Sequence, residues 1–356
     1  MKNYFRLLLI FILAAVLAFT SCNLDGGSED DGGGSEDDGG AAVVPFDNAS
    51  TAGEKVTVTA DGVSFEMIYV PGGLTCPIGI DDDNTAEVTD AYWIGETEVT
   101  YELWQKVYTW ATSGSGGATG EGDYNFANAG REGNNGTIEA DPTGAKNEPV
   151  TTVNWRDSMV WCNALTEWYN VQKGTSDVCV YTYSSSIIRD SRDGNATACD
   201  GAVVSASAKG FRLLSSNEYE LAARYRGTDT TNVVTGEIGS VDFDVMATKW
   251  TTGNSASGDT HAYNATPLTV GDYAVYSVNS GSSTAVVKSK TANALGACDM
   301  SGNVWEWCFD FGSGSYRVRW GGGYNFAANL LRVGYWFSSN PSSGSYNIGF
   351  RFSRTQ

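Results

Sequence analysis

Thiol, imidazole and carboxylate side chains are the groups through which this chain could do covalent, acid–base or metal chemistry. The 356 residues include 7 cysteines, 42 acidic residues and a single histidine, His261. Because His261 lies in the polar stretch 258–262, we expect a solvated loop residue rather than a metal ligand. A Ser/His/Asp triad needs a positioned imidazole, and nothing around His261 marks a nucleophile. The carboxylates are plentiful, but their spacing identifies no acid–base pair.

The cysteines differ in the roles that their positions suggest. One of them, Cys22, ends the N-terminal segment, and six remain: Cys76, Cys162, Cys179, Cys199, Cys298 and Cys308. An even number in an exported protein permits disulfides, and the favoured pair flanks an apparent insertion: Cys179 and Cys199. Three others lie in a helix-like run or inside blocks expected to belong to the core, where we expect small buried thiols: Cys162, Cys298 and Cys308.

Residues 1–22 have the pattern of an export signal. Two basic residues precede the apolar run 7–19, which is too short to span a bilayer and is typical of a secretory signal. Thr20 and Ser21 then lead into Cys22. This ending resembles a bacterial lipoprotein processing site, which implies that Cys22 becomes the lipidated mature N-terminus. The alternative is an ordinary cleaved signal that leaves Cys22 free.

Residues 23–50 are expected to form a flexible tether. The acidic, glycine-rich unit at 26–31 is repeated at 33–38, and it has no apolar side chain to bury, so it cannot fold alone. A self-repelling tether of about 16 residues would hold a folded domain roughly 20 Å or more from its anchor. The formal charge of −20 and the pI near 4.3 argue against nucleic acid or anionic lipid as a partner.

Residues 51–356 are expected to form a single domain, enlarged by polar surface insertions at 113–147 and 174–209. The 11 tryptophans and 41% hydrophobic residues are enough for a substantial core. No heptad or self-complementary patch points to an oligomer, so we expect a monomer.

Three segments of the domain have helix signals. Thr100 can cap a first helix, whose apolar residues follow at helical spacing. A second helix is expected over 156–169, with its apolar side chains on one face. Ser215 forms a capping box with Glu218 at the start of a third helix, and Gly227 is expected to end it.

A series of sequence blocks carries the most specific signal. Near the C-terminus these are CDMSGNVWEW at 298–307, GGGY at 321–324, Arg332, and NIGFR at 347–351. The series resembles the C-terminal half of the formylglycine-generating-enzyme (sulfatase-modifying factor) domain, a variant of the C-type lectin fold. Further blocks of that family occur upstream in the family's order, at 66–73, 93–100, 149–155 and 210–224. The resemblance implies an α+β C-type lectin fold of the formylglycine-generating-enzyme type, with few helices, short strands and long loops.

The resemblance does not extend to the catalytic residues. The resemblance implies that formylglycine generation would need a copper-binding cysteine pair in the segment after the Gly-Gly-Ser block, because thiolates suit Cu(I). The matching segment, 324–337, has no cysteine. A second branch of the fold holds non-haem iron with several histidines, whereas this chain has one. We therefore expect no catalytic residue and no catalytic cofactor.

The C-terminal region, about 317–356, departs from the family selectively and has the composition of a paratope, in which aromatics give rigid contact area and Ser or Gly adaptable polarity. It resembles the variable region of proteins diversified by retroelements. The predicted ligand-binding residues are Trp320, Gly323, Tyr324, Phe326, Ala327, Leu330, Gly334, Trp336, Phe337, Ser338, Ser339, Ser342, Ser343, Gly344, Ser345 and Tyr346. The alternative is that the aromatics pack the core.

A structural calcium ion is a further expectation from the resemblance. The positions that match the family's calcium ligands are Asp299, Glu306 and the carbonyls of Gly302 and Val304, and such oxygen ligands suit Ca²⁺. In the alternative arrangement, Asn303 fastens loop backbone and Glu306 pairs with an arginine, Arg332 or Arg351.

Together these features predict a non-enzymatic receptor or adhesin that binds a protein or glycan ligand through a region diversified by a retroelement. The protein would be lipid-anchored and outward-facing on the bacterial outer membrane or cell surface. Two alternatives stay open at this point: a catalytic, oxidase-like member with a relocated active site, and a lectin-like lipoprotein of fixed specificity.

Overall fold

The structure of the protein is a computed structural model that describes residues 46–356 except 115–119, 145–146 and 206. The predicted signal, Cys22 and most of the predicted tether lie outside the described residues. From Phe46 onward the described residues belong to one compact unit. None of the described helices combines the length and apolar character that a membrane span requires.

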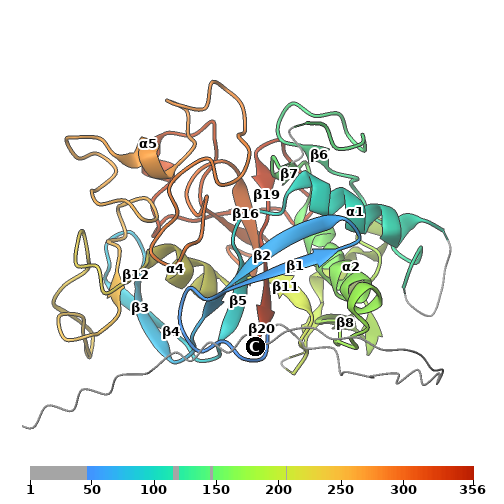
Figure 1. The fold of residues 1–356 in the computed structure, drawn as a ribbon, viewed down its shortest axis with the longest axis horizontal. Coiled ribbons are helices and arrows are strands. Elements are labelled where there is room, and N and C mark those ends of the chain that lie inside the picture. The colour runs from blue at the N-terminus through green and yellow to red at the C-terminus, as the bar shows by residue number, and fades with distance from the viewer. Residues whose placement is uncertain (1–45, 115–119, 145–146, 206) are drawn as a thin grey trace, which may run out of the picture. The chain divides into compact units, whose positions relative to one another are not determined.

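An antiparallel five-stranded sheet joins the two ends of this unit, in the order β1-β2-β5-β20-β11. Its strands are β1 (Lys55–Ala60), β2 (Val63–Val70), β5 (Tyr92–Gly95), β20 (Phe352–Thr355) and β11 (Phe211–Leu213). The C-terminal strand β20 lies between β5 and β11, as Figure 1 shows. The C-terminal residues of β20 are therefore needed to connect β5 and β11 within this sheet.

The three predicted helices are present, and two of them carry the predicted caps. Their bounds are α1 (Tyr101–Thr112), α2 (Trp155–Lys173) and α4 (Ser216–Arg224). The Thr100 side chain accepts from the Leu103 N–H, and Ser215 forms its capping box with Glu218, as predicted. Gly227 does not end the third helix: α4 stops at Arg224 because the chain continues directly into a strand, β12 (Tyr225–Gly227). Two helices are short, α3 (Ala196–Asp200) and α5 (Val270–Tyr273).

A second sheet of four strands, in the order β18-β17-β16-β19, is built almost entirely from the C-terminal region. Its strands are β16 (Trp305–Phe311), β17 (Arg317–Trp320), β18 (Phe337–Ser339) and β19 (Ile348–Gly349). β16 and β17 form a hairpin, β18 pairs antiparallel with β17, and β19 runs parallel to β16. The last predicted blocks of the sequence thus meet in one sheet.

The remaining strands are short and pair locally. They are β3 (Leu74–Ile78) with β4 (Asn84–Val88), β6 (Arg131–Glu132) with β7 (Val150–Thr151), β8 (Tyr181–Tyr183) with β9 (Ser186–Ile187) and β10 (Val203–Val204), β12 with β15 (Lys249–Trp250), and β13 (Glu237–Ile238) with β14 (Val241–Asp242). Two single 3-10 turns occur at Asp193–Asn195 and Ala328–Leu330. The architecture is α+β with few helices, short strands and long loops, as predicted.

The core is rich in tryptophan and extends further than the sequence suggested. Trp104 and Trp161, from α1 and α2, stack with ring centroids 5.7 Å apart. Phe46 is 1% exposed and its carbonyl accepts from the Trp93 indole, so residue 46, which was predicted to lie in the tether over 23–50, belongs to the core. The predicted insertions are not simple surface loops either, because each contributes a buried ring, Tyr124 and Tyr181.

Candidate functional site

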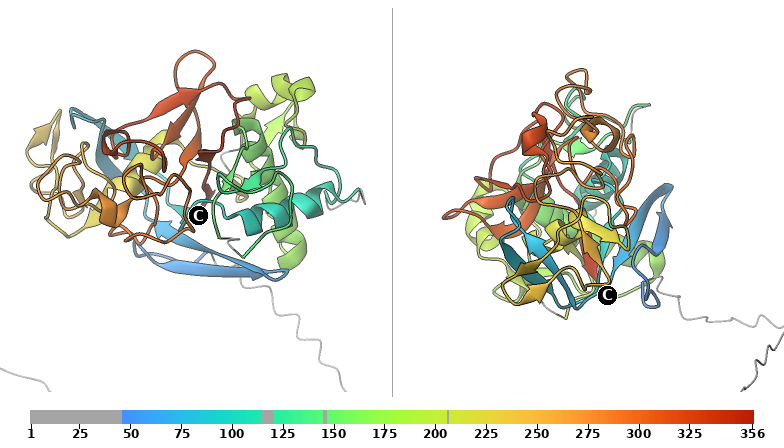
Figure 2. Two further views of the ribbon diagram at one scale, coloured as in Figure 1. Left: turned by 90° about the horizontal axis from the view of Figure 1, so that it is seen from above. Right: turned by 90° about the vertical axis from the view of Figure 1, so that its left-hand side faces the viewer.

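The β16–β17 hairpin presents two different faces because side chains alternate along a strand. Its turn is closed by the Gly312 N–H, which donates to the Tyr316 carbonyl at 2.8 Å, and Figure 2 shows the turn standing out from the body of the domain. In β17, Val318 and Trp320 point into the core, while Arg317 and Arg319 point to the other side. The pairing register places Arg319 opposite Phe337 of β18.

Each of the two arginines lies between a buried indole and an exposed phenyl ring. The guanidinium carbon of Arg317 is 3.7 Å from the Trp155 ring centroid and 3.6 Å from that of Phe311. That of Arg319 is 4.9 Å from Trp305 and 5.1 Å from Phe337. Stacking of this kind holds a planar guanidinium in one orientation. We define the arginine–aromatic face by four residues: Phe311, Arg317, Arg319 and Phe337. Arg317 is 2% exposed and is covered by the Phe311 ring, whereas Arg319 is partly exposed.

The two arginines differ in their hydrogen bonds. Arg317 donates to the carbonyls of Phe309 at 2.9 Å and Asp200 at 3.0 Å. Arg319 has no hydrogen bond and no ion pair among the residues that the structure describes, and its Nε is buried. Burial lowers the pKa of each guanidinium to about 10, so both stay charged at neutral pH. The face therefore combines apolar rings with a fixed positive charge.

Several predicted ligand-binding residues are exposed near this face. Trp336, Phe337 and Tyr346 are 46%, 49% and 49% exposed. Trp336 lies beside the hairpin turn, because a Cβ added at Gly312 would be 3.4 Å from its ring. The others on β18 and the loop after it are exposed or partly exposed: Ser338, Ser339, Ser342, Ser343, Gly344 and Ser345.

Other predicted residues are elsewhere. Phe326 packs edge-on against Trp305, and Leu330 is half-buried. Ala327 is exposed and lines a separate hollow with Tyr276 and Leu268. Phe326 therefore packs on the same indole, Trp305, on which Arg319 stacks, whereas Ala327 faces the separate hollow.

Four predicted contacts are corrected because they are buried: Trp320, Gly323, Tyr324 and Gly334. Trp320 is 2% exposed and stacks on Tyr219 with ring centroids 5.8 Å apart, on the core side of β17. Gly334 allows close backbone approach, since a Cβ there would lie 2.3 Å from the Gly79 carbonyl oxygen. For Trp320 the structure follows the alternative in which the aromatic packs the core.

Residues on the N-terminal side of the predicted region also have exposed aromatic rings. Phe311 and Tyr316 are 56% and 47% exposed, and neither they nor the two arginines of β17 were among the predicted contacts. A signal was present: the Gly-Ser-Gly-Ser turn at 312–315 marks a hairpin, and strand alternation then places the arginines opposite Trp320.

The predicted calcium ligands are used differently. Both Glu306 oxygens are taken by Arg351, at 2.7 and 2.8 Å, in a fully buried pair, which is the alternative arrangement. Asp299 accepts from the Lys288 N–H at 2.8 Å, while its other oxygen is buried and has no hydrogen-bond partner in the described structure. Among the described residues no group of three or more His, Cys, Asp or Glu side chains could hold a metal ion. Because Glu306 is occupied by a cationic partner, the predicted set does not fit calcium.

The loop before β16 is instead fastened by an amide. Asn303 accepts from the Ala285 N–H at 3.0 Å and donates to Glu98 at 2.6 Å, and Glu98 also accepts from the Val304 N–H at 3.0 Å. Gly302, whose carbonyl was a predicted ligand, has φ 88 and its N–H donates to the Gly321 carbonyl. These contacts position the start of β16.

The predicted disulfide is also corrected, because all six described cysteines are free and buried. The Cys179 thiol approaches the Asn163 carbonyl at 3.5 Å, whereas the Cys199 thiol approaches the Asp190 carbonyl at 3.2 Å. Burial raises the thiol pKa of Cys298 to about 11 and that of Cys199 to about 12, so little thiolate is present at neutral pH. The imidazole Nδ1 of His261 forms hydrogen bonds with the hydroxyls of Thr260 and Thr269, at 2.9 and 3.3 Å.

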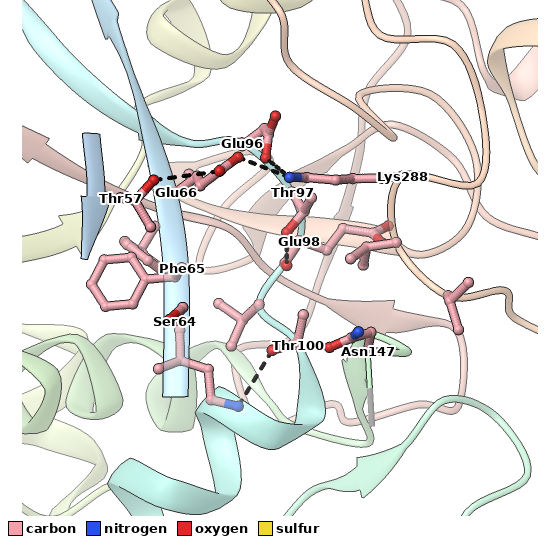
Figure 3. A pocket seen from close by; sticks show the side chains of 16 residues that line it. Thr57, Ser64, Phe65, Glu66, Glu96, Thr97, Glu98, Thr100, Asn147 and Lys288 are labelled. Carbon is pink, nitrogen blue, oxygen red and sulfur yellow. Dashed lines mark hydrogen bonds and ion pairs between the residues drawn. The ribbon is translucent and has the colours of Figure 1, made fainter. Parts of the chain in front are cut away.

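A cavity of about 370 Å³ lies between β2, β5 and the loop around Lys288 (Figure 3). None of the residues that line it belongs to the β16–β17 hairpin. Phe65, Val99 and Phe352 contribute apolar walls. Its carboxylates are largely satisfied: Lys288 forms ion pairs with Glu66, at 2.9 Å, and with Glu96. The cavity is amphipathic and its charges are internally paired.

Residues 54–356 match the sulfatase-modifying factor enzyme 1-like domain, and the chain belongs to this family. Among solved structures of similar fold is Treponema denticola variable protein 1, with a TM-score of 0.57 and 26% identity, covering 85% of this chain and 99% of that one. CarF has a TM-score of 0.57 and 23% identity, covering 82% of this chain and 98% of its own. The predicted C-type lectin fold of the formylglycine-generating-enzyme type is confirmed.

The names of two sequence relatives indicate different functions. Chaperone protein LppX of Paenibacillus barcinonensis is 28% identical over 312 residues, 83% of this chain and 89% of that protein. Formylglycine-generating enzyme of Streptomyces coelicolor is 38% identical over 89 residues, which are 19% of this chain and 28% of the enzyme. The family therefore includes enzymes, and membership alone assigns no activity to this chain.

Proposed function

We propose that the protein is a non-enzymatic ligand-binding protein whose arginine–aromatic face, extended by Trp336 and the 338–346 loop, contacts the ligand. The observation that carries this proposal is the gathering of the half-exposed rings of Phe311 and Phe337 with the stacked, partly exposed Arg319 on neighbouring strands of the second sheet. Interface hot spots are enriched in such Trp, Tyr and Arg side chains, and contiguous exposed apolar surface is unusual without a partner.

The lack of cysteine in the segment where an oxidase of this family would bind copper supports the same proposal. Segment 324–337 contains no cysteine, and Cys308, at the end of the Gly-Asn-Val-Trp-Glu-Trp block, is fully buried. Burial raises the pKa of the Cys308 thiol well above its usual range. A copper-binding thiolate pair therefore has no counterpart near the face.

The proposal includes display and diversification. The ligand would be a protein or glycan, bound by a monomer held through lipidated Cys22 on the outward-facing bacterial surface. One solved structure of similar fold is that of a variable protein, Treponema denticola variable protein 1. Because Trp336 to Ser339 and Ser342 to Tyr346 include many exposed side chains, a retroelement could change them with little loss of stability.

Two measurements test this function. Deep sequencing of the locus in a clonally expanded culture should place adenine-derived changes at 336–339 and 342–346 and spare the buried Trp320 codon; a uniform rate together with the absence of a template repeat would contradict diversification. Incubation of the full chain with copper and a cysteine-containing sulfatase peptide should leave the peptide thiol unchanged. Conversion of that thiol to an aldehyde would overturn the non-enzymatic assignment.

A further inference from the structure

Arg319 is the exception among the arginines that the structure describes. Every other described arginine donates a hydrogen bond to a carboxylate or a backbone carbonyl, including Arg332, which donates to the Asn329 carbonyl at 2.7 Å. Arg319 does neither, although acidic residues outnumber basic ones by 42 to 22 in the chain. A guanidinium has five N–H donors, and leaving buried donors unpaired costs free energy.

The surroundings of Arg319 keep this charge ready for an external acceptor. Trp305 beneath it is 2% exposed, while Phe337 on its other side is 49% exposed, so the guanidinium lies between the core and the solvent. Stacking fixes the guanidinium plane, which reduces the entropy that an incoming acceptor would have to remove. No carboxylate raises its pKa; Tyr335 is the one group that does.

The neighbouring side chains indicate what carries the acceptor. Phe311 and Phe337 flank the two arginines on adjacent strands, and both rings are about half exposed. A carboxylate that reached Arg319 would therefore lie beside the half-exposed Phe337 ring, and its hydrogen bonds to the guanidinium would be charge-assisted, which makes them stronger than neutral ones. Aspartate or glutamate beside apolar side chains of a protein matches this combination of charge and apolar contact better than a uniformly hydroxylated sugar.

We propose that Arg319 is the anchor for an aspartate or glutamate carboxylate of a protein ligand, whose neighbouring apolar side chains pack on Phe311 and Phe337. This assignment rests on the proposed function, because it requires the arginine–aromatic face to be the binding surface. It adds the chemistry of the ligand: an acidic residue within an apolar segment, bound bidentately through the guanidinium of Arg319.

The test uses a phage-displayed library of random dodecapeptides, selected on the immobilised full chain. Selected peptides are then measured, by fluorescence anisotropy, against the full chain and the variants Arg319→Gln, Arg319→Lys and Phe311→Ser. Arg332→Gln is the matched control, because it removes the same charge from another ring-stacked arginine. Thermal unfolding of each variant shows whether it is folded.

The expected peptides contain Asp or Glu next to an apolar residue and bind Arg319→Gln at least about tenfold more weakly than the full chain. Arg319→Lys should recover part of the affinity, and Arg332→Gln should bind within about twofold of the full chain. Changing the acidic peptide residue to its amide should cost as much as Arg319→Gln, a comparison that does not depend on the folding of any variant.

Two other outcomes separate the inference from the function on which it rests. Neutral peptides that lose affinity with Phe311→Ser but bind Arg319→Gln unchanged would overturn the carboxylate anchor and leave the face as the binding surface. Selection of no peptide, or of peptides indifferent to both substitutions, would count against the proposed face and the anchor together.

Discussion

At the scale of single residues, two buried carboxylates of the same block have opposite environments. Glu306 is neutralised by Arg351, which also donates to the carbonyls of Gly95, Glu96 and Cys298. Asp299 has no ion pair among the described residues, and burial raises its pKa to about 6. Since its unfolded pKa is about 3.9, the folded protein holds the extra proton between about pH 4 and 6, so this group makes stability fall as the pH rises through that window.

Replacing Asp299 with Asn should therefore stabilise the protein at pH 7 by about 1–3 kcal/mol. Asparagine keeps an acceptor for the Lys288 N–H and tolerates the positive φ of 56 at this position. Urea unfolding at pH 4.5 and pH 7 should show that Asp299→Asn loses part of the wild-type pH dependence. A variant that is less stable, and only when calcium is present, would restore Asp299 as a metal ligand.

At the scale of elements, β17 decides which aromatic side chains of the C-terminal region are available. Val318 and Trp320 face the core, whereas Arg317 and Arg319 face the aromatic side, and the register to β18 continues this division. Composition could not separate the two sets, because paratopes and cores both use tryptophan. Local signals did predict the helix starts, since the caps of α1 and α4 are satisfied within three residues of chain.

Trp320→Ala and Trp336→Ala test this division. Trp320→Ala removes a buried ring that stacks on Tyr219 and should lower the free energy of unfolding by about 3–5 kcal/mol. Trp336→Ala removes a ring that is 46% exposed and should change it by less than about 1 kcal/mol. Guanidinium unfolding curves give both values, and equal destabilisation by the two substitutions would contradict the assigned faces.

At the scale of the whole molecule, the face is carried by a scaffold that closes through its C-terminal strand. β20 pairs with β5 and β11, so residues before and after the binding region are fixed in the first sheet. Arg351 then links this sheet to β16 through Glu306. Substitutions of the exposed residues on the face therefore leave the β20 pairing and the Arg351–Glu306 ion pair unchanged.

This separation predicts different tolerance to randomisation. A display library that varies the exposed positions Trp336, Phe337, Ser343 and Tyr346 should yield mostly folded, protease-resistant proteins, because few core contacts change. A matched library that varies the buried positions should yield mostly unfolded ones: Trp320, Tyr324, Gly334 and Ile348. Similar folded fractions in the two libraries would show that the scaffold and the face are not independent.

The sequence by itself determined the family, the α+β class, the capped starts of two helices and the region in which the exposed aromatics lie, because these depend on local caps and on ordered blocks of residues. Only the tertiary structure decided that Trp320 is core, that Cys179 and Cys199 have separate partners, that Glu306 pairs with Arg351, and that Phe311 joins Arg317 and Arg319 on one face. These outcomes depend on strand register and on contacts between residues far apart in the chain, which neither composition nor local spacing encodes.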